Sequence, residues 1–387
     1  MIDVKAYGNF LMQHFAFFSG VPDSSLSNLC AYLSDQVKAS QHIIAANEGN
    51  ALALAAGHYL ATKQPAVVYM QNSGLGNIIN PLLSLNDPAV FGIPALLFIG
   101  WRGEPGTKDE PQHKKQGIVT LPLLEASGIR YAIHPDNLED AKQMIEDAKQ
   151  YMLTEQAPFA IVLPKGLFSD YKLPPTPANV QLPRREEAIG AVLDCLDDRT
   201  VIVCTTGMPS RELFELRKKR GQQHDADFLT VGCMGHASQI ALGIAIEKPD
   251  KEVICLDGDG AILMHMGAMA IIGTVACPNF IHIVLNNAAH DSVGGQPTVA
   301  AQIDIINIAK ACGYVVAKRV DNLSDMKTAL LSQRNQPRKG AILLEVMLQK
   351  GARDDLGRPT SDPQQNKTAF MKVLSNDTTS HIRSSYS

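Results

Sequence analysis

The sequence lacks the features of several protein classes. Its formal net charge of −4 gives no reason to expect nucleic acid or an anionic membrane surface as a partner. No apolar stretch approaches the roughly 20 residues of a membrane-spanning helix. The apolar segment 10–18 is interrupted by Gln13 and His14 and follows no basic region, so it is a poor signal peptide. We therefore expect a cytoplasmic protein.

Cysteine patterns and two enzyme signatures are also missing. The seven cysteines are scattered, odd in number and include no C-x-x-C pair, so buried reduced thiols are expected rather than disulfides or zinc. No G-x-G-x-x-G segment opens a βαβ unit, which argues against a nicotinamide dehydrogenase. No Ser-His-Asp spacing suggests a covalent nucleophile.

The apolar runs that are present predict an α/β fold. At 387 residues the chain is long enough for two domains, each with its own core. In both halves, apolar runs typical of buried parallel strands alternate with alanine-rich or amphipathic stretches typical of helices. Strands are expected at 42–46, 66–70, 95–100, 159–163, 200–204, 252–256, 280–285 and 341–347. Helices are expected at 24–34, 50–62, 138–152, 237–247, 261–275 and 322–333.

This alternation predicts two doubly wound parallel-sheet domains with a linker between them. Residues 173–183 are rich in proline and lack an apolar period, which is typical of a semi-extended linker. The serine- and threonine-rich residues from Asn376 onward are expected to fray. The predicted limits are 1–170 for the first domain, 171–185 for the linker, 186–375 for the second domain and 376–387 for the tail.

Two polar turns are expected after successive strands of the second half. Asp257-Gly258-Asp259-Gly260 follows one apolar run, and Asn286-Asn287 ends the next. Parallel neighbouring strands would bring both turns to the carboxyl edge of the sheet, where α/β folds bind ligands. One carboxylate and one amide carbonyl suit Mg²⁺, which takes oxygen ligands and keeps phosphate and water as others. An acid-glycine turn alone is a weak signal, but the Asn-Asn pair strengthens it.

This spacing resembles the metal and diphosphate motif of thiamine-diphosphate enzymes. The resemblance implies that Asp259, Asn287 and the backbone carbonyl of Ala289 bind Mg²⁺. Glycine is usual at the position of Ala288, where alanine would cost about 1 kcal/mol if the loop needs a positive φ. The resemblance also implies that residues 186–375 bind the diphosphate, through Thr206, Gly207, Gly232, Gly258, Asp259, Gly260, Ala261 and Asn287.

Met234 is a further cofactor candidate. It lies in Gly232-Cys233-Met234-Gly235-His236, before an alanine-rich helix, and matches the large apolar residue that supports the bent cofactor in this family. The alternative is a core methionine, because methionine fills irregular gaps readily. Its position in the motif favours the cofactor role.

The first half carries a candidate activating carboxylate. Glu48 lies in Asn47-Glu48-Gly49-Asn50-Ala51, between an expected strand and an expected helix. From the residues alone it is a first-turn acid favoured by the helix dipole, worth a few tenths of a kcal/mol. The resemblance implies instead the carboxylate that activates the pyrimidine ring, which makes residues 1–170 the pyrimidine-binding domain. A glycine-rich loop matching the one beside that ring would contribute Asn72, Ser73, Gly74, Gly76 and Asn77.

Asp23 is a candidate proton donor. The segment 20–24, with sequence G-V-P-D-S, matches a turn that contributes a polar active-site residue in related decarboxylases. N-capping of the next helix by Asp23 or Ser24 is an equally weighted alternative.

The chain resembles phosphonopyruvate decarboxylases and, next to them, sulfopyruvate decarboxylases. The likeness runs nearly end to end and includes W-R-G-E-P-G-T-K-D-E-P-Q-H at 101–113, H-D-S-V-G-G-Q-P-T at 290–298 and K-G-A-R-D-D-L-G-R-P-T at 350–360. It implies non-oxidative decarboxylation of 3-phosphonopyruvate to phosphonoacetaldehyde and CO2, with thiamine diphosphate and Mg²⁺. Sulfopyruvate remains an alternative substrate. A non-catalytic thiamine-diphosphate-binding protein is a further alternative, against which Glu48 argues.

A doubly charged phosphonate needs cationic donors, preferably an arginine fork. The candidates are Arg102, His113, His290 and Arg353, and His113 is also a catalytic candidate. In this family the cofactor lies between domains of two subunits, which implies at least a homodimer. The sequence leaves open the pathway, the oligomer size above two and the cation that holds the phosphonate.

Overall fold

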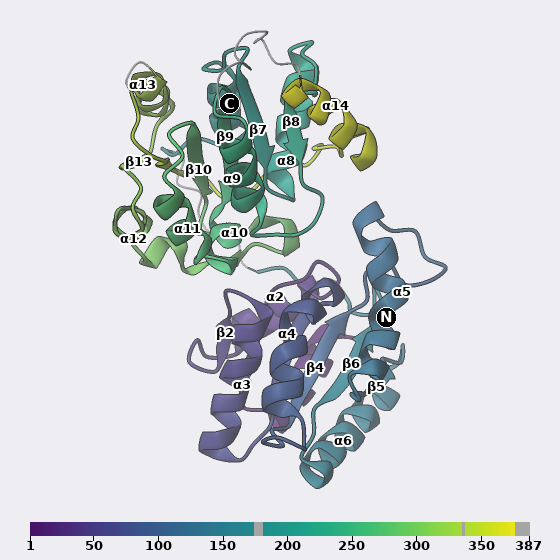
Figure 1. The fold of residues 1–387 in the computed structure, drawn as a ribbon. Helices are drawn as coiled ribbons and strands as arrows, with labels where there is room; N and C mark the ends of the chain where they lie inside the picture. The colour runs from purple at the N-terminus through teal and green to yellow at the C-terminus, as the bar shows by residue number, and fades with distance from the viewer. Residues whose placement is uncertain (174–180, 335–336, 376–387) are drawn as a thin grey trace, which may run out of the picture. The chain divides into compact units, whose positions relative to one another are not determined.

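The computed structural model describes residues 1–173, 181–334 and 337–375. The chain forms two compact units: unit 1 comprises Met1–Pro177 with His290–Thr298, and unit 2 comprises Ala178–Ala289 with Val299–Ser387. Each unit contains a six-stranded sheet between two layers of helices (Figure 1). The tail predicted at 376–387 and the part of the predicted linker at 174–180 lie outside the described residues.

The sheet of unit 1 is entirely parallel. Its strand order is β2(His42–Ile44), β1(Phe18–Gly20), β3(Ala66–Gln71), β4(Ala95–Gly100), β6(Phe159–Leu163) and β5(Arg130–Ile133). Side chains of α1(Val4–His14), α2(Ser27–Gln36) and α6(Leu138–Glu155) form one core with the sheet. Side chains of α3(Glu48–Thr62), α4(Leu75–Pro81) and α5(Pro111–Ala126) form the other. Alternate residues of β3 and β4 enter the two cores, as the strand period of two requires.

The sheet of unit 2 repeats this plan. Its strand order is β13(Val316–Val320), β14(Ile342–Met347), β10(Phe280–Asn286), β9(Glu252–Gly258), β7(Thr200–Cys204) and β8(Asp227–Leu229), all parallel. One core includes side chains of α7(Arg185–Leu193), α8(Met208–Lys219) and α13(Leu323–Arg334). The other includes side chains of α9(Ala237–Glu247), α10(Asp259–Met264), α11(Ala268–Val275), α12(Ile305–Cys312) and α14(Pro363–Ser375). The predicted class, two doubly wound parallel-sheet domains, is confirmed.

Some predicted elements differ from the structure. Strands β1, β5, β8 and β13 were not predicted, because they are only three to five residues long and include polar residues. The single helix expected at 261–275 is wrong: His265 leaves the helical conformation and Gly267 precedes a second helix, α11. Glycine inside a helix loses conformational entropy, which favours a break there.

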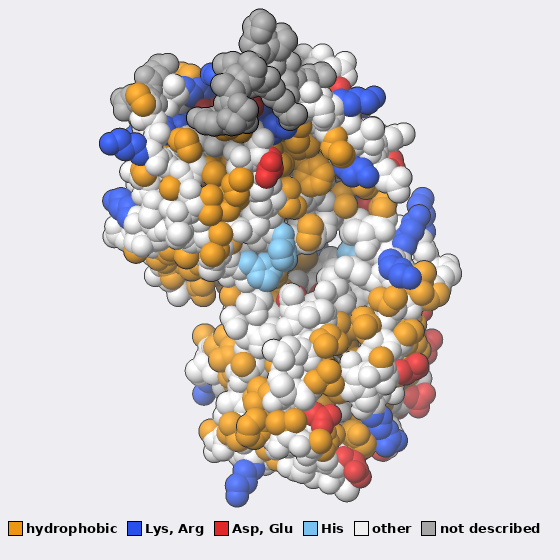
Figure 2. All heavy atoms as spheres, in the orientation of Figure 1, with side chains coloured by type: hydrophobic (Ala, Val, Ile, Leu, Met, Phe, Trp, Pro, Cys, Tyr) orange, Lys and Arg blue, Asp and Glu red, His pale blue; other side chains and the backbone are white. Residues whose placement is uncertain are grey.

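The surface and the thiols add two observations. On the face that Figure 2 shows, lysine and arginine side chains are interspersed with acidic, hydrophobic and other residues. All seven cysteines are free, and Cys233 is exposed while five others are buried. Among the helices in the described part of the chain, none has the length and hydropathy needed to cross a bilayer.

Candidate active site

The predicted metal segment is a direct junction between a strand and a helix. Strand β9 continues to Gly258, which has φ −102° and ψ 156°, and α10 begins at Asp259, whose side chain is buried. No residue separates β9 from α10, and neither Gly258 nor Gly260 has a positive φ, so the polar turn expected here is wrong. A Cβ on Gly258 would contact Thr205 at an ordinary 4.0 Å, so the chain itself leaves room there. A glycine with free space beside a helix start fits the close approach of a phosphate group.

The asparagine pair lies beside this junction. In the parallel register of β9 and β10, Leu285 pairs with Gly258, so Asn286 and Asn287 follow at the same edge as Asp259. The Asn287 Oδ1 accepts the amide of Ala289 at 3.1 Å. The Asn286 amide donates to Glu345 at 2.8 Å, and the Ala288 amide donates to Asn286 Oδ1 at 3.0 Å. The loop that follows β10 is therefore held by defined bonds.

The loop does require a positive φ at Ala288, the case in which the sequence predicted a cost for alanine. Its φ is 54°. For a residue with a Cβ this conformation costs roughly 1–2 kcal/mol. The loop is strained at the residue between the proposed ligands Asn287 and Ala289.

Glycines with a positive φ also occur in the two other segments of the proposed diphosphate site, which are 206–207 and 232–235. Gly207 has φ 95° and precedes α8 directly after Thr206, so a residue with a Cβ would be strained there. Gly235 has φ 84°, and a Cβ on it would lie 3.0 Å from the carbonyl oxygen of Ala261. The loop 232–235 thus packs closely on α10.

Met234 lies on this loop and is only partly buried. Among the described residues, it belongs to neither hydrophobic core of unit 2. Its placement does not support the alternative of a core methionine, and it leaves the side chain available to a ligand.

Glu48 is the first residue of α3, and its side chain is 5% exposed. Asn47 caps the helix by accepting the amide of Asn50 at 2.9 Å, so Glu48 is not needed as a cap. The Asn77 amide donates to Glu48 Oε2 at 2.6 Å. A Cβ on Gly74 would lie 2.6 Å from Glu48 Cγ, so a side chain at 74 would displace the Glu48 carboxylate from this position. A carboxylate this deeply buried exceeds what a helix-dipole role needs.

The remaining residues of the loop 72–77 have different surroundings. The Asn72 amide donates to the carbonyl oxygen of Arg102 at 2.8 Å and to Thr120 Oγ1 at 2.9 Å, which ties this loop to the segment after β4. Ser73 is exposed and donates to Gln71, and Gly76 is exposed with open space around it. In this loop Asn77 therefore hydrogen-bonds Glu48 and Gly74 leaves space for it, whereas the Asn72 side chain is already hydrogen-bonded to Arg102 and Thr120.

Asp23 is fully buried, three residues after the end of β1. The Gln71 amide donates to Asp23 Oδ1 at 2.6 Å, and the backbone amide and hydroxyl of Ser25 donate to Oδ2. Helix α2 begins only at Ser27, and its N-cap residue Leu26 makes no side-chain capping bond. The alternative that Asp23 or Ser24 caps this helix is therefore wrong.

Arg102 and Arg353, two of the substrate candidates, are already paired with acids. The Arg102 Nε and Nη2 bind both oxygens of Asp109 at 2.8 and 2.5 Å, and Nη1 donates to Ser24 at 2.6 Å. Arg353 contacts three carboxylates, which are those of Glu186, Glu215 and Asp355. Arg353 thus fastens the segment after β14 to α7 and α8, and its charge is compensated.

The two histidine candidates favour the neutral form. Burial lowers the pKa of His113 on α5, and the nearby Arg102 lowers it further. Burial lowers the pKa of His290 to about 4. At pH 7 these rings can donate or accept a hydrogen bond but do not supply a full positive charge.

Arg211 is a candidate site residue that the sequence analysis did not predict. It lies in the first turns of α8, four residues after Gly207, and is partly buried. Within the described residues its guanidinium makes no hydrogen bond or ion pair, and burial lowers its pKa. An arginine just inside a helix that follows a predicted phosphate-binding glycine was the signal that could have identified it.

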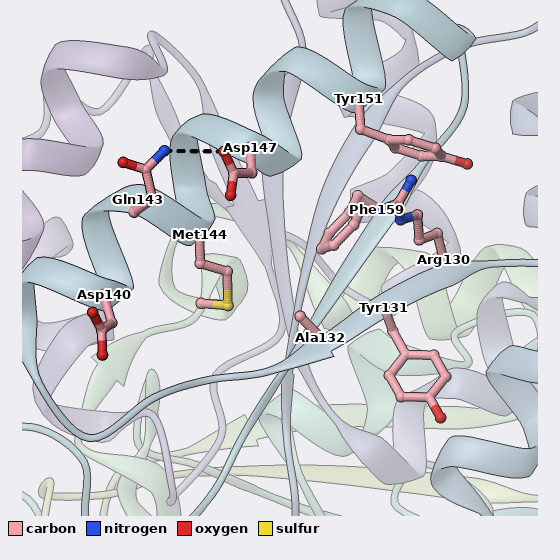
Figure 3. A pocket seen from close by; sticks show the side chains of 9 residues that line it. All are labelled: Arg130, Tyr131, Ala132, Asp140, Gln143, Met144, Asp147, Tyr151 and Phe159. Atoms are coloured by element: carbon pink, nitrogen blue, oxygen red, sulfur yellow. Dashed lines mark hydrogen bonds between the residues drawn. The ribbon is translucent and has the colours of Figure 1, made fainter.

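A separate pocket of about 360 Å³ lies on unit 1 between β5 and α6. Figure 3 shows Arg130 beside the ring of Tyr151, with its guanidinium 4.8 Å from the ring centre, and Gln143 pointing to Asp147. None of the predicted site residues lines it. This pocket is not part of the candidate active site.

Comparison with known proteins gives two family matches, one in each half of the chain. Residues 12–121 match the N-terminal TPP binding domain of thiamine pyrophosphate enzymes, and residues 202–346 match the C-terminal TPP binding domain. A phosphonopyruvate decarboxylase of Streptomyces viridochromogenes is 35% identical over 372 residues, covering 92% of this chain and 90% of the relative. That of Streptomyces hygroscopicus is 34% identical, covering 92% and 89%. A sulfopyruvate decarboxylase of Methanosarcina acetivorans is 28% identical, covering 92% of both.

The Ala288 conformation predicts that Ala288→Gly stabilises the protein. Glycine removes the left-handed strain but adds freedom to the unfolded chain, so the net gain in free energy of unfolding should be about 0.5–1 kcal/mol. Urea denaturation measures it. Ala276→Gly, at a φ of 55° after α11, is the matched control and should gain as much. A loss of stability in Ala288→Gly alone would contradict the strain.

The Arg102–Asp109 pair predicts an acid-sensitive contribution to stability. Arg102 holds the pKa of Asp109 at about 2, below its usual 3.8. A depressed pKa stabilises the fold above about pH 4, and this stability is lost as the pH falls toward 2. With allowance for solvent screening the contribution is about 1–2 kcal/mol, and Asp109→Asn should lack it.

Unfolding can be followed through Trp101, which is buried beside this pair. Glu139→Gln, which removes an exposed ion pair with Lys142, should leave the pH dependence nearly unchanged. Equal acid sensitivity in Asp109→Asn and the unaltered protein would refute the assignment.

Proposed function

This chain belongs to the phosphonopyruvate decarboxylase family of thiamine pyrophosphate enzymes, and on this premise we propose that it decarboxylates 3-phosphonopyruvate to phosphonoacetaldehyde and CO2 without oxidation. The observation that carries the proposal is the likeness to phosphonopyruvate decarboxylases along 92% of the chain. Two features support it: in unit 1 the Glu48 side chain is buried, and in unit 2 Asp259 and Asn287 lie at one edge of the sheet.

The cofactor supplies the carbanion and electron sink that decarboxylation of a 2-oxo acid requires. In the proposed site, Asp259, Asn287 and the carbonyl of Ala289 bind Mg²⁺, which suits hard oxygen ligands. The amides at the start of α10 and α8 receive the diphosphate, beside Gly258 and Gly207.

Proton transfer is assigned to unit 1. We propose that Glu48 exchanges a proton with the pyrimidine ring and that Asn77 fixes its carboxylate. Asp23 is proposed to deliver a proton to the product, held in place by Gln71 and Ser25. His113 remains a second proton-transfer candidate, because its neutral ring can donate or accept.

The phosphonate requires donors that are not fully used inside the protein. Arg102 retains further N–H groups on Nη1 and Nη2 beyond its bonds to Asp109 and Ser24. We therefore propose Arg102 as the main substrate cation, with His113 and His290 as neutral donors. Arg353 is a weaker candidate because three carboxylates surround it.

A direct comparison of substrates tests the proposal. Phosphonopyruvate, sulfopyruvate and pyruvate are supplied at equal concentration with thiamine diphosphate and Mg²⁺, and CO2 release is measured. We expect the highest kcat/KM with phosphonopyruvate. Faster turnover of sulfopyruvate would favour the alternative suggested by the 28% identical relative. Binding of the cofactor without CO2 from any of the three would favour a non-catalytic binding protein.

Glu48→Gln should abolish most turnover while the cofactor still binds. The amide cannot take up a proton as a carboxylate does, so kcat should fall by about 10²–10⁴-fold. Calorimetric titration should give a cofactor affinity close to that of the unaltered protein. Glu139→Gln, on the exposed face of α6, is the control and should be fully active. Retention of kcat in Glu48→Gln would refute the role.

We further propose that the active unit is a homodimer with each site shared between two chains. The Glu48→Gln and Asp259→Ala variants should each be nearly inactive, the latter because it loses a Mg²⁺ ligand. Mixing them under exchange should restore up to about a quarter of full activity, because half the dimers then contain one intact site. No recovery from mixed dimers, or a fully active monomer in sedimentation, would contradict the shared site.

A further inference from the structure

A buried hydrogen-bonded chain lies behind the proposed metal ligand Asp259. Tyr314, His282 and Asp257 are 4%, 0% and 0% exposed. The Tyr314 hydroxyl lies 3.0 Å from His282 Nδ1, and His282 Nε2 lies 3.3 Å from Asp257 Oδ2. The other carboxylate oxygen of Asp257 accepts the amide of Gly258 at 3.0 Å. The chain therefore runs from the segment after α12 across β10 and β9 to the residue preceding α10.

The direction of each bond follows from the donors and acceptors. The carboxylate oxygens of Asp257 accept, so the His282 Nε2–H donates to Asp257. His282 Nδ1 then accepts the hydroxyl proton of Tyr314. Burial raises the pKa of Tyr314, which keeps this proton in place. All members of the chain are thus satisfied by one arrangement of protons.

This hydrogen-bonded chain ends at the backbone amide of Gly258. Gly258 is the N-cap of α10, it has no side chain, and its own surroundings would leave room for a Cβ. A glycine has more backbone freedom than other residues, so its orientation must be fixed from outside. Asp257 fixes the Gly258 amide, and the next residue is Asp259.

We propose that Tyr314 and His282 are positioning residues, which hold Asp257 and through it the Gly258 amide, so that the carboxylate of the next residue, Asp259, stays oriented toward Mg²⁺. The inference rests on the proposed role of Asp259. Partners of metal-binding residues commonly change metal affinity by about 10–100-fold when they are removed. Nothing in the sequence motif identified Tyr314 or His282, which lie 55 and 23 residues from Asp259.

A second reading of the same cluster is a metal centre. Ligand atoms of Cys255, Asp257 and His282 lie within 4.8 Å of one another. However, both ring nitrogens of His282 and both oxygens of Asp257 are already bonded within the chain. Burial also raises the pKa of Cys255 well above its usual value, which opposes the thiolate that a metal would require. The hydrogen-bonded arrangement is therefore favoured.

The test is Tyr314→Phe, which removes one oxygen and keeps the ring. We expect the Kd for Mg²⁺, measured by calorimetry with thiamine diphosphate present, to rise about 10-fold, the lower end of this range, with kcat at saturating Mg²⁺ nearly unchanged. Asp257→Ala should raise the Kd further, and Asp257→Asn, which keeps an oxygen for the Gly258 amide, should recover most of the affinity.

The control is Tyr7→Phe in unit 1, where the Tyr7 hydroxyl lies 2.9 Å from His134 in an equally buried pair. It should lose stability as Tyr314→Phe does, without any change in Mg²⁺ affinity. Equal Mg²⁺ affinity in Tyr314→Phe and the unaltered protein would overturn the inference. So would a stoichiometric transition metal in the purified protein that is absent from His282→Phe. Because binding is measured directly, these outcomes stay distinct from a failure to decarboxylate phosphonopyruvate.

Discussion

The parallel pairing of β9 and β10 is the constraint on which the proposed metal site depends. Their register places Gly258 opposite Leu285, so that the chain leaves both strands at one edge of the sheet. Neither segment alone could bring both proposed ligands, Asp259 and Asn287, to that edge. The hydrophobic cores on both faces keep the register, because a slip by one residue would turn every core side chain to the other face. The chemistry of the second unit is therefore a consequence of how its centre is packed.

In the first unit, three acidic side chains are held by hydrogen-bond donors of the same unit. Glu48, Asp23 and Asp109 are acids with little or limited exposure, and each has a defined donor: Asn77, Gln71 and Arg102, respectively. Two of these donors, Asn77 and Gln71, are neutral amides. Asp109 is instead bonded to the guanidinium of Arg102, which fixes the segment after β4. The proposed proton-transfer acids and the acid of the ion pair therefore differ in the kind of donor that holds them.

The sequence predicted the central strands and the class of fold because long apolar runs have few alternatives. It did not predict β5 or β13, whose residues are partly exposed and polar at the sheet edges. It made Asp259 and Asn287 candidates through their positions after strands, and it made Glu48 a candidate through the resemblance to thiamine-diphosphate enzymes. It could not show that Arg353 is surrounded by carboxylates, or that Arg102 is bonded to Asp109, because those partners depend on tertiary packing. Nor could it distinguish a turn at 257–260 from a strand that enters a helix directly.

The contact between Gly74 and Glu48 has a consequence for other members of the family. No residue with a side chain fits at 74 while the carboxylate stays where it is, since a Cβ would lie 2.6 Å from Glu48 Cγ. Gly74 has an ordinary φ, so only this contact calls for glycine. We therefore expect the two positions to covary among related proteins: where position 48 is not acidic, position 74 need not be glycine. A large side chain at 74 would then indicate a relative that keeps the fold but lacks the proposed activating carboxylate.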